Sequence, residues 1–377
     1  MRIAFYAPLK PPDHPVPSGD RRVARLLIDA LRVAGHQVSL ASRFRSRDRG
    51  DGVRQQRLEQ LGCRLAERFV ARAAPPPDLW FTYHLYDKAP DWIGPWAAAS
   101  LGVPYVAAEA SVALRRANGP WALGHEAVTA ALRRAALVVH LNSADRAGVE
   151  AAVGARPALL LKPFLDAAPY ARARAARAAT RSRLAAEHDL PPATPWLIVV
   201  GMMRDGDKLA SYRLLAEALS RLDDRPWRLL VVGDGPARAA VEQALAPLGR
   251  RVVLFGAQDE AGIAALLAAS DLLVWPAINE AFGMALLEAQ AAGLPVVAGR
   301  TGGVPDIVAH EATGLLTDSG AAGPLAEAIA ALLDDPERRR AMGEAALAKV
   351  AAEHTLDAAA RRLDGALAPL VRRNAAE

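Results

Sequence analysis

The hydrophobic residues of the chain gather in short continuous runs that alternate with longer segments of helical spacing. The run Leu272–Trp275 is bounded by Pro276, and Val296–Ala298 follows a helical segment that ends at Gly293. Short, fully apolar runs of this kind are typical of buried parallel strands. Residues 271–308 therefore predict a strand-loop-helix-strand-loop-helix unit of a doubly wound fold, whose ligands bind beyond the carboxyl ends of the strands.

The same alternation continues along the rest of the chain, which has 377 residues and is long enough for two domains. The other expected strands lie at 2–7, 37–40, 79–83, 104–108, 137–141, 159–161, 196–200, 228–232, 252–255 and 314–316. We expect an N-terminal Rossmann-like domain at 1–165, a linker at 166–195, a second domain at 196–353, and a C-terminal amphipathic helix at 354–377 that packs on the first domain.

Composition places the chain among well-filled globular proteins. Hydrophobic residues make up 52% of it and its mean hydropathy is +0.08, which excludes a disordered chain. Apolar runs stay shorter than the ~18 residues that span a bilayer, and the first residues lack the features of a signal peptide. Cys63 stands alone, so we expect neither a disulfide framework nor a cysteine metal site, and a cytoplasmic location.

Positive charge is concentrated in the first half of the chain. Residues 1–160 contain 22 Lys and Arg against 14 Asp and Glu, whereas the rest is slightly acidic. Nine arginines crowd one segment, at positions 43, 45, 47, 49, 54, 57, 64, 68 and 72. Phe44 and Phe69 are the only aromatic residues of that segment, too few for a surface that stacks on bases, so no nucleic-acid partner is expected. A solvated arginine-rich face is the slightly favoured interpretation, and peripheral association with an anionic membrane face, or an anionic acceptor, is the other.

Two glutamates lie within residues 271–308. Glu280 ends the loop after the first strand, and Glu288 lies eight residues later in the following helix. A carboxylate accepts hydrogen bonds from sugar hydroxyls, and the free backbone N–H groups of Phe282, Gly283 and Met284 favour an anion such as phosphate. A nucleotide-activated sugar carries both kinds of group. Without this context, two glutamates near a helix are more often a solvated face.

The motifs around these glutamates resemble those of a known family. The runs E-A-F-G-M-A-L-L-E at 280–288, A-A-G-L-P-V-V at 291–297 and T-G-G-V-P-D at 301–306 are similar to those of the family 4 retaining glycosyltransferases, clearly so from Trp196 to Leu316. The resemblance implies an α/β GT-B fold, with two doubly wound Rossmann-like domains facing a cleft and a C-terminal helix that crosses back to the first domain. It also implies that Glu288 takes ribose hydroxyls and Glu280 the sugar.

The resemblance assigns further donor residues in the second domain. Family members have an arginine directly after the glycine that ends the 196–200 strand, and a lysine several residues on, which neutralise the donor diphosphate. Here Gly201 is followed by Met202, so we expect Arg204 to supply the first cation and Lys208 the second. Gly233, in the turn G-D-G-P, is expected at the nucleotide pocket.

The first domain carries one expected donor-binding glycine and the expected acceptor-side residues. Gly19 stands alone where the family has a glycine pair near the donor phosphates. Glu109 ends a strand where many members have a histidine that points at the reacting sugar carbon. It is expected to hydrogen-bond a donor or acceptor hydroxyl or to act as a base toward an acceptor alcohol, and pairing with an arginine is the other interpretation. His84 and Asn142 follow neighbouring strands and are expected at the acceptor, although His84 is about as well explained as a packed or solvated histidine.

The sequence thus predicts a hexosyltransferase that moves a sugar from a nucleotide-diphosphate sugar, as co-substrate, to a hydroxyl of a glycan, glycolipid or small-molecule acceptor. The resemblance implies that the configuration at the sugar carbon is retained and that the reaction requires no metal. No other cofactor is expected. Two alternatives stay open because Met202 and Glu109 depart from the family pattern. One is a nucleotide-sugar-binding protein with little turnover, and the other is a nucleotide-sugar epimerase.

Overall fold

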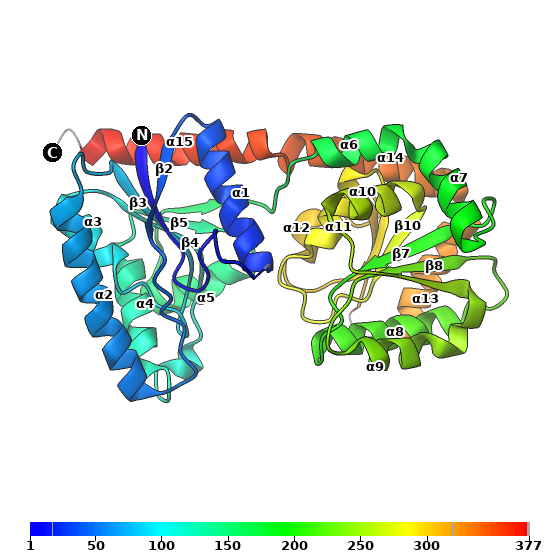
Figure 1. Ribbon diagram of the computed structural model, residues 1–377, viewed down its shortest axis with the longest axis horizontal. Coiled ribbons are helices and arrows are strands. Elements are labelled where there is room, and N and C mark those ends of the chain that lie inside the picture. The colour runs from blue at the N-terminus through cyan, green and yellow to red at the C-terminus, as the bar shows by residue number, and fades with distance from the viewer. Residues whose placement is uncertain (17, 319, 375–377) are drawn as a thin grey trace. The chain divides into compact units, whose positions relative to one another are not determined.

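The chain forms two compact α/β units, each built around a parallel sheet (Figure 1). The computed structural model describes residues 1–16, 18–318 and 320–374, so the last three residues of the expected C-terminal helix lie outside the described residues. Unit 1 comprises residues 1–162 together with the chain from Leu356 onward, and unit 2 comprises Pro163–Thr355.

Unit 1 contains six strands in the described residues, in the order β2-β1-β3-β4-β5-β6. The strands are β1 Arg2–Tyr6, β2 Gln37–Ser42, β3 Leu79–Tyr86, β4 Tyr105–Ser111, β5 Leu137–His140 and β6 Ala158–Leu160. The helices are α1 Gly19–Val33, α2 Gly52–Arg72, α3 Gly94–Leu101, η1 Leu114–Arg116, α4 Ala122–Arg134, α5 Asp145–Val153 and α15 Leu356–Asn374.

Unit 2 likewise contains six strands among the residues described, in the order β12-β11-β10-β7-β8-β9. They are β7 Trp196–Val200, β8 Arg228–Val232, β9 Val252–Gly256, β10 Leu272–Trp275, β11 Val296–Gly299 and β12 Gly314–Thr317. The helices are α6 Ala168–Ala175, α7 Arg177–His188, α8 Asp207–Ser220, α9 Arg238–Leu245, η2 Ala246–Arg251, α10 Glu260–Ala269, α11 Met284–Ala291, α12 Val304–Ile307, α13 Ala322–Asp334 and α14 Pro336–Glu353.

The expected fold class is confirmed. The fold depends on the apolar character of the central strands. All described strand pairs within the two sheets are parallel, as in β10 with β7 and β11. Every residue of β10 is buried, because helices cover both faces of the sheet; in Figure 1, α8 and α9 lie below it and α6, α7 and α10 above. A strand covered on both faces must be apolar throughout rather than at alternate positions.

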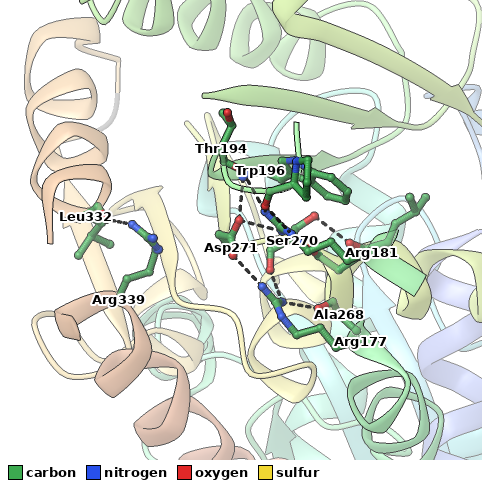
Figure 2. Close-up of polar contacts among 12 residues, drawn as sticks. Arg177, Arg181, Thr194, Trp196, Ala268, Ser270, Asp271, Leu332 and Arg339 are labelled. Carbon is green, nitrogen blue, oxygen red and sulfur yellow. Dashed lines mark hydrogen bonds and ion pairs between the residues drawn. The ribbon is translucent and has the colours of Figure 1, made fainter. Parts of the chain in front are cut away.

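Residues 166–195, which the sequence analysis assigns to a linker, form helices α6 and α7 and belong to unit 2. Arg177 donates to Asp271 at 2.7 Å, and Arg181 donates to the other carboxylate oxygen at 3.0 Å (Figure 2). The same carboxylate accepts from the backbone N–H of Trp196 at 2.8 Å. Asp271 therefore fixes α7 to the starts of β7 and β10, a contact between residues too distant in sequence for a propensity argument to find.

The C-terminal helix α15 belongs to unit 1, where it packs against α1. Leu363 and Leu367 are fully buried on its inner face. Arg362 donates to the carbonyl of Leu160 at 2.9 Å, and His36 Nε2 lies 3.4 Å from the Asp364 carboxylate. Unit 1 is thus completed by a helix that follows the whole of unit 2 in the sequence.

We expect Asp271→Ala to lower the free energy of unfolding of unit 2 by about 2–3 kcal/mol, because it leaves two guanidinium groups and a strand N–H without their shared acceptor. Urea denaturation, followed by hydrogen exchange of the β7 amides, measures the loss. The matched control is Glu187→Ala, which removes an exposed ion pair with Arg183 on α7 and should cost less than about 0.5 kcal/mol. Equal losses in the two variants would contradict the role assigned to Asp271.

Candidate functional site

The sheet of unit 2 reverses its direction of growth between β7 and β10, and the expected donor residues gather there. From β7 the chain continues to β8 on one side, and from β10 it continues to β11 on the other. Such a reversal leaves a crevice outside the carboxyl ends of the two strands, where open α/β sheets bind ligands. Lys208 follows β7 at the start of α8, and Glu280 follows β10 in the loop before α11.

Lys208 and Glu280 form an ion pair at this point of the sheet. Lys208 Nζ lies 2.5 Å from Glu280 Oε2, and the indole N–H of Trp275 donates to the same oxygen at 3.2 Å. The lysine ammonium also lies 5.2 Å from the centre of the Trp275 ring. The two side chains are 24% and 17% exposed, so the pair remains in reach of a ligand. A phosphate could replace the carboxylate as the partner of the lysine.

The loop that carries Glu280 is fixed by the helix that carries the lysine. Asn279 has a φ of 49°, in the left-handed region, and its amide donates to the Asp207 carboxylate at 3.1 Å. Ser211 Oγ accepts from the backbone N–H of Ile278 at 3.2 Å. Since Asp207 and Ser211 both belong to α8, loop and helix hold one another in place.

Gly201 and Gly233, both expected at the donor, come into direct contact. The φ of Gly233 is 143°, and a Cβ on it would lie 1.9 Å from the carbonyl oxygen of Gly201. The N–H of Gly201 donates to Val232 at 2.9 Å, while the Tyr212 hydroxyl donates to the Gly201 carbonyl at 2.8 Å. A side chain at position 233 would therefore displace the end of β7.

Helix α11 begins at Met284, directly after Gly283, whose φ of 73° only glycine adopts without strain. The backbone N–H groups of Phe282, Gly283 and Met284 thus lie where a helix leaves donors without partners inside the helix. Glu288 lies about one turn further and is 3% exposed. It is a buried carboxylate, which excludes the solvated face as its explanation.

The structure leaves Arg204 apart from this group. Its side chain is exposed, as is that of Met202, which is 47% accessible. The Arg204 carbonyl accepts from the N–H of Leu209, so its backbone is part of the start of α8. The assignment of Arg204 to the diphosphate stays a prediction.

In unit 1, the expected residues His84 and Glu109 meet Asp20, the neighbour of Gly19. They meet where the strand order reverses between β1 and β3. Gly19 is the first residue of α1, and its neighbour Asp20 lies in the first helical turn. His84 Nδ1 lies 3.0 Å from Asp20 Oδ1 and 3.8 Å from Glu109 Oε2. We call Asp20, His84 and Glu109 the carboxylate–histidine cluster. It joins α1, β3 and β4 at their ligand-facing edge.

His84 and Glu109 share an uncommon backbone conformation. Their φ angles are 62° and 53°, in the left-handed region, which costs on the order of 1–3 kcal/mol for each residue. The register places Tyr83 opposite Ala108, and regular pairing resumes one residue beyond the two strained positions. The two strands therefore interrupt their alternation at the same level, which brings both side chains together.

Burial and charge set the protonation of this cluster. Burial raises the pKa of Glu109 to about 6, against the opposing effects of the His84 imidazole and the Tyr83 hydroxyl. Burial lowers the pKa of His84, but the carboxylates of Glu109 and Asp20 outweigh it and the net pKa is raised. The His84 imidazole, whose Nδ1 lies 3.0 Å from Asp20 Oδ1, lowers the pKa of Asp20.

Asn142 joins this cluster through a neighbour. It is buried, donates to Asp145 Oδ2 at 2.6 Å, and accepts from the Asp145 N–H at 2.9 Å. The Asp145 carboxylate in turn raises the pKa values of both His84 and Glu109. Asn142 therefore orients a carboxylate that acts on the cluster.

Sequence reasoning missed two residues of these sites. The sequence predicts Trp275 only as part of a buried strand, yet its indole N–H donates to Glu280. The signal that could have identified this contact is that a buried indole at a strand end needs a hydrogen-bond acceptor. Asp20 follows Gly19 directly, and an acid in the first turn of a helix at a sheet reversal is the signal that could have identified it.

Metal binding and membrane crossing are two further properties on which the described residues bear. No group of three or more His, Cys, Asp or Glu residues in that part of the chain has an arrangement that could hold a metal ion. Among the helices described, none combines the length and apolar character required to cross a membrane.

Comparison with known proteins agrees with this geometry. Residues 190–349 match the family model described as "Glycosyl transferases group 1". In this segment the chain is similar to the group 1 glycosyltransferases. The match includes β7 to β12 and therefore the expected donor residues of unit 2, whereas Gly19 and the carboxylate–histidine cluster lie outside it.

Individual relatives of the chain differ in their named substrates. It is 34% identical over 64% of its length, and 65% of the relative's, to 2-deoxystreptamine glucosyltransferase of Streptomyces kanamyceticus. It is 41% identical to N-acetyl-alpha-D-glucosaminyl L-malate synthase of Bacillus anthracis over 32% of its own length. The chain spans about a third of the length of several curated relatives that it matches, 31% in that case and 34% for D-inositol 3-phosphate glycosyltransferase of Corynebacterium aurimucosum.

Solved structures share the fold of the chain over nearly its whole length. HepE of Anabaena, in complex with UDP, superposes with a TM-score of 0.75 at 20% identity, covering 98% of this chain and all of that one. Sucrose-phosphate synthase of Thermosynechococcus elongatus superposes with a TM-score of 0.72 at 23% identity, covering 100% and 99%. At this identity the likeness establishes the fold alone.

Stability should depend on pH through Glu109. Its pKa in the folded chain is about 6, above the ordinary 4.5, so its contribution to stability is fully present below pH 4.5 and is lost as the pH rises through 6. The loss amounts to about 2 kcal/mol at pH 8. Glu109→Gln stays neutral at every pH. The free energy of unfolding of the variant, measured against that of the wild type, should therefore rise by about that amount between pH 4 and pH 8.

Urea denaturation between pH 4 and 8 measures this difference. Glu126→Gln, a substitution at an exposed position of α4 in the same unit, is the matched control and should track the wild type at every pH. A difference between Glu109→Gln and the wild type that does not change with pH would refute the assignment of a buried, ionising Glu109.

Proposed function

We propose that this protein transfers a hexose from a nucleotide-diphosphate sugar to an acceptor hydroxyl, with retention of configuration. The observation that carries the proposal is the Lys208–Glu280 pair at the strand reversal of unit 2, next to the start of α11 and the buried Glu288. This arrangement offers one cation, one accessible carboxylate, one buried carboxylate and a helix N-terminus. A nucleotide sugar requires all four kinds of group.

The donor would lie along the loops that follow β7, β8 and β10. Glu288 takes the ribose hydroxyls, and Glu280, released from its lysine, takes sugar hydroxyls. The amides at 282–284 face the phosphates, as the N-terminus of α11 favours an anion. The close approach of Gly233 to Gly201 supports this proposal, because it removes side-chain bulk from the same edge of the sheet.

Lys208 is the proposed source of catalysis at the leaving group. Departure of the nucleoside diphosphate develops negative charge on the phosphate oxygens, and a cation already placed there stabilises that charge without rearranging. Its contacts with Glu280 and Trp275 hold the ammonium in place before the donor binds. Arg204, exposed two residues beyond Met202, is the proposed second cation. No step in this scheme is assigned to a metal ion.

Unit 1 is the proposed acceptor side. Glu109 is buried beside His84, and its raised pKa of about 6 suits a group that accepts a proton from a hydroxyl near neutral pH. The relatives named above act on unlike acceptors, so they favour no particular glycan, glycolipid or small molecule for this chain.

A nucleotide-sugar-binding protein with little turnover is the second candidate, favoured by one observation. Met202 stands exposed where an arginine is expected, which removes a cation from the diphosphate site. An epimerase is a third candidate. Acceptor-dependent release of nucleoside diphosphate distinguishes a transferase from both, because a binding protein releases none and an epimerase converts the donor without an acceptor.

Donor binding should be visible as thermal stabilisation by one of UDP, GDP, ADP or their common sugars. A ligand at ~100 times its Kd stabilises the folded chain by roughly 2.7 kcal/mol. Glu288→Ala should reduce that stabilisation because the ribose loses its carboxylate. The control is Glu217→Ala on the exposed face of α8, which should keep the full shift. A folded protein that none of these nucleotides stabilises would rule out the donor site.

Lys208→Ala should reduce kcat of the transfer reaction by about 10²–10³-fold, since one preorganised stabilising group is lost from the developing charge. The measurement is the steady-state release of nucleoside diphosphate in the presence of acceptor. Arg221→Ala, at the far end of α8, removes an exposed cation and should leave kcat unchanged. A Lys208→Ala variant that raises KM but keeps kcat would limit the lysine to binding.

A further inference from the structure

The carboxylate–histidine cluster of unit 1 holds an acceptor atom that the chain itself does not satisfy. Glu109 is 7% exposed, and its buried Oε2 accepts no hydrogen bond of standard geometry from the residues described, although the Tyr83 hydroxyl is close enough to lower the pKa of the carboxyl. A buried carboxylate oxygen in this state is costly, so most are paired in native structures. The unmet oxygen faces His84 Nδ1 at 3.8 Å, which in turn lies 3.0 Å from Asp20 Oδ1.

The charges around Glu109 are mostly negative. After His84, the charged groups that act most strongly on it are Asp20 and Asp145, and both oppose its ionisation. The nearby basic residues have other neighbours. Lys10 acts on Asp20, and Arg116, 3.4 Å from the buried Asp87, lies near Tyr86 together with Arg47. The basic surplus of unit 1 therefore does not neutralise Glu109.

We propose that Glu109 and Asp20 bind a protonated amine of the acceptor, so that the acceptor is an amino sugar or an aminated polyol. The inference rests on the proposed function, since it names the class of molecule that receives the sugar. An ammonium brings three donors and one positive charge to a place with two carboxylates and an imidazole. A hydroxyl brings one donor and no charge, so it would leave the excess negative charge of the cluster in place.

The backbone supports a fixed amine site rather than a flexible acidic patch. Glu109 is presented by β4 and His84 by β3, at the level where both strands adopt the left-handed conformation, and Asp20 is held in the first turn of α1. Asn142 fixes Asp145 behind them with two hydrogen bonds. An ammonium at this place would therefore meet carboxylates whose backbone positions are already fixed, which favours selective binding.

The test compares amines with a neutral sugar of the same shape. The probes are 2-amino-2-deoxyglucose, 3-amino-3-deoxyglucose, 6-amino-6-deoxyglucose and glucose, titrated calorimetrically into the full chain at pH 7, where the amines are largely protonated. At least one amine should bind tenfold or more tightly than glucose. Glu109→Gln, which keeps the shape and removes the charge, should abolish the preference, and Asp20→Asn should weaken it.

Two further arms make the result specific. Glu150→Gln, an exposed charge change on α5, should keep the preference in full. Lowering the pH from 7 to 5 should reduce the preference, since Glu109 is then largely protonated while the amine stays charged. Glucose binding as tightly as all three amines, or a preference that survives Glu109→Gln, would overturn the proposal.

Failure here is separable from failure of the proposed function. The nucleotide-induced thermal shift depends on unit 2 and should persist in folded Glu109→Gln protein. If that shift is present and sensitive to Glu288→Ala while no amine is preferred, the amine site is wrong and the glycosyltransferase assignment stands. If no nucleotide binds but an amine does, the cluster is a binding site and the transferase assignment fails.

Discussion

The structure depends on one constraint of parallel sheets, which is that all strands of a sheet end at the same edge. Where the strand order reverses, the connections leave in opposite directions and the edge stays open. In unit 2 this places Lys208 and Glu280, which are 72 residues apart in sequence, within 2.5 Å of one another. In unit 1 the same constraint brings the first turn of α1 to His84. Each cluster of charged residues is thus a consequence of the topology.

Much of unit 2 could be predicted because its chemistry is encoded locally. The run from β10 to α12 contains the strand, the glutamates and the helix start within about forty residues, so apolar patterning and motif spacing suffice to place them. The supporting contacts could not be predicted in this way. Trp275 bonds Glu280, and Asn279 bonds Asp207, only once α8 lies beside the loop. The helices at 166–195 were likewise missed as part of the unit, because Asp271 holds them from far along the chain.

The carboxylate–histidine cluster shows where sequence reasoning reaches its limit. The ends of β3 and β4 identified His84 and Glu109 as candidates, since side chains after parallel strands face ligands. Their convergence depends on two left-handed residues at one register level, and such a φ at a histidine or a glutamate has no local signal, as glycine would give. The partnership with Asp20 depends on tertiary packing of α1. Composition, patterning and motifs therefore predicted the residues but not the cluster.

Net charge and site charge differ in this protein for a physical reason. Unit 1 is rich in arginine, yet the group around Glu109 is dominated by carboxylates. At physiological ionic strength, exposed charges are screened over about 8 Å, so arginines on the surface of α2 contribute little at a buried carboxylate. Burial has the opposite effect, because it removes screening and strengthens the nearest partners. The few groups close to Glu109, and not the composition of the domain, therefore set the charge of the carboxylate–histidine cluster.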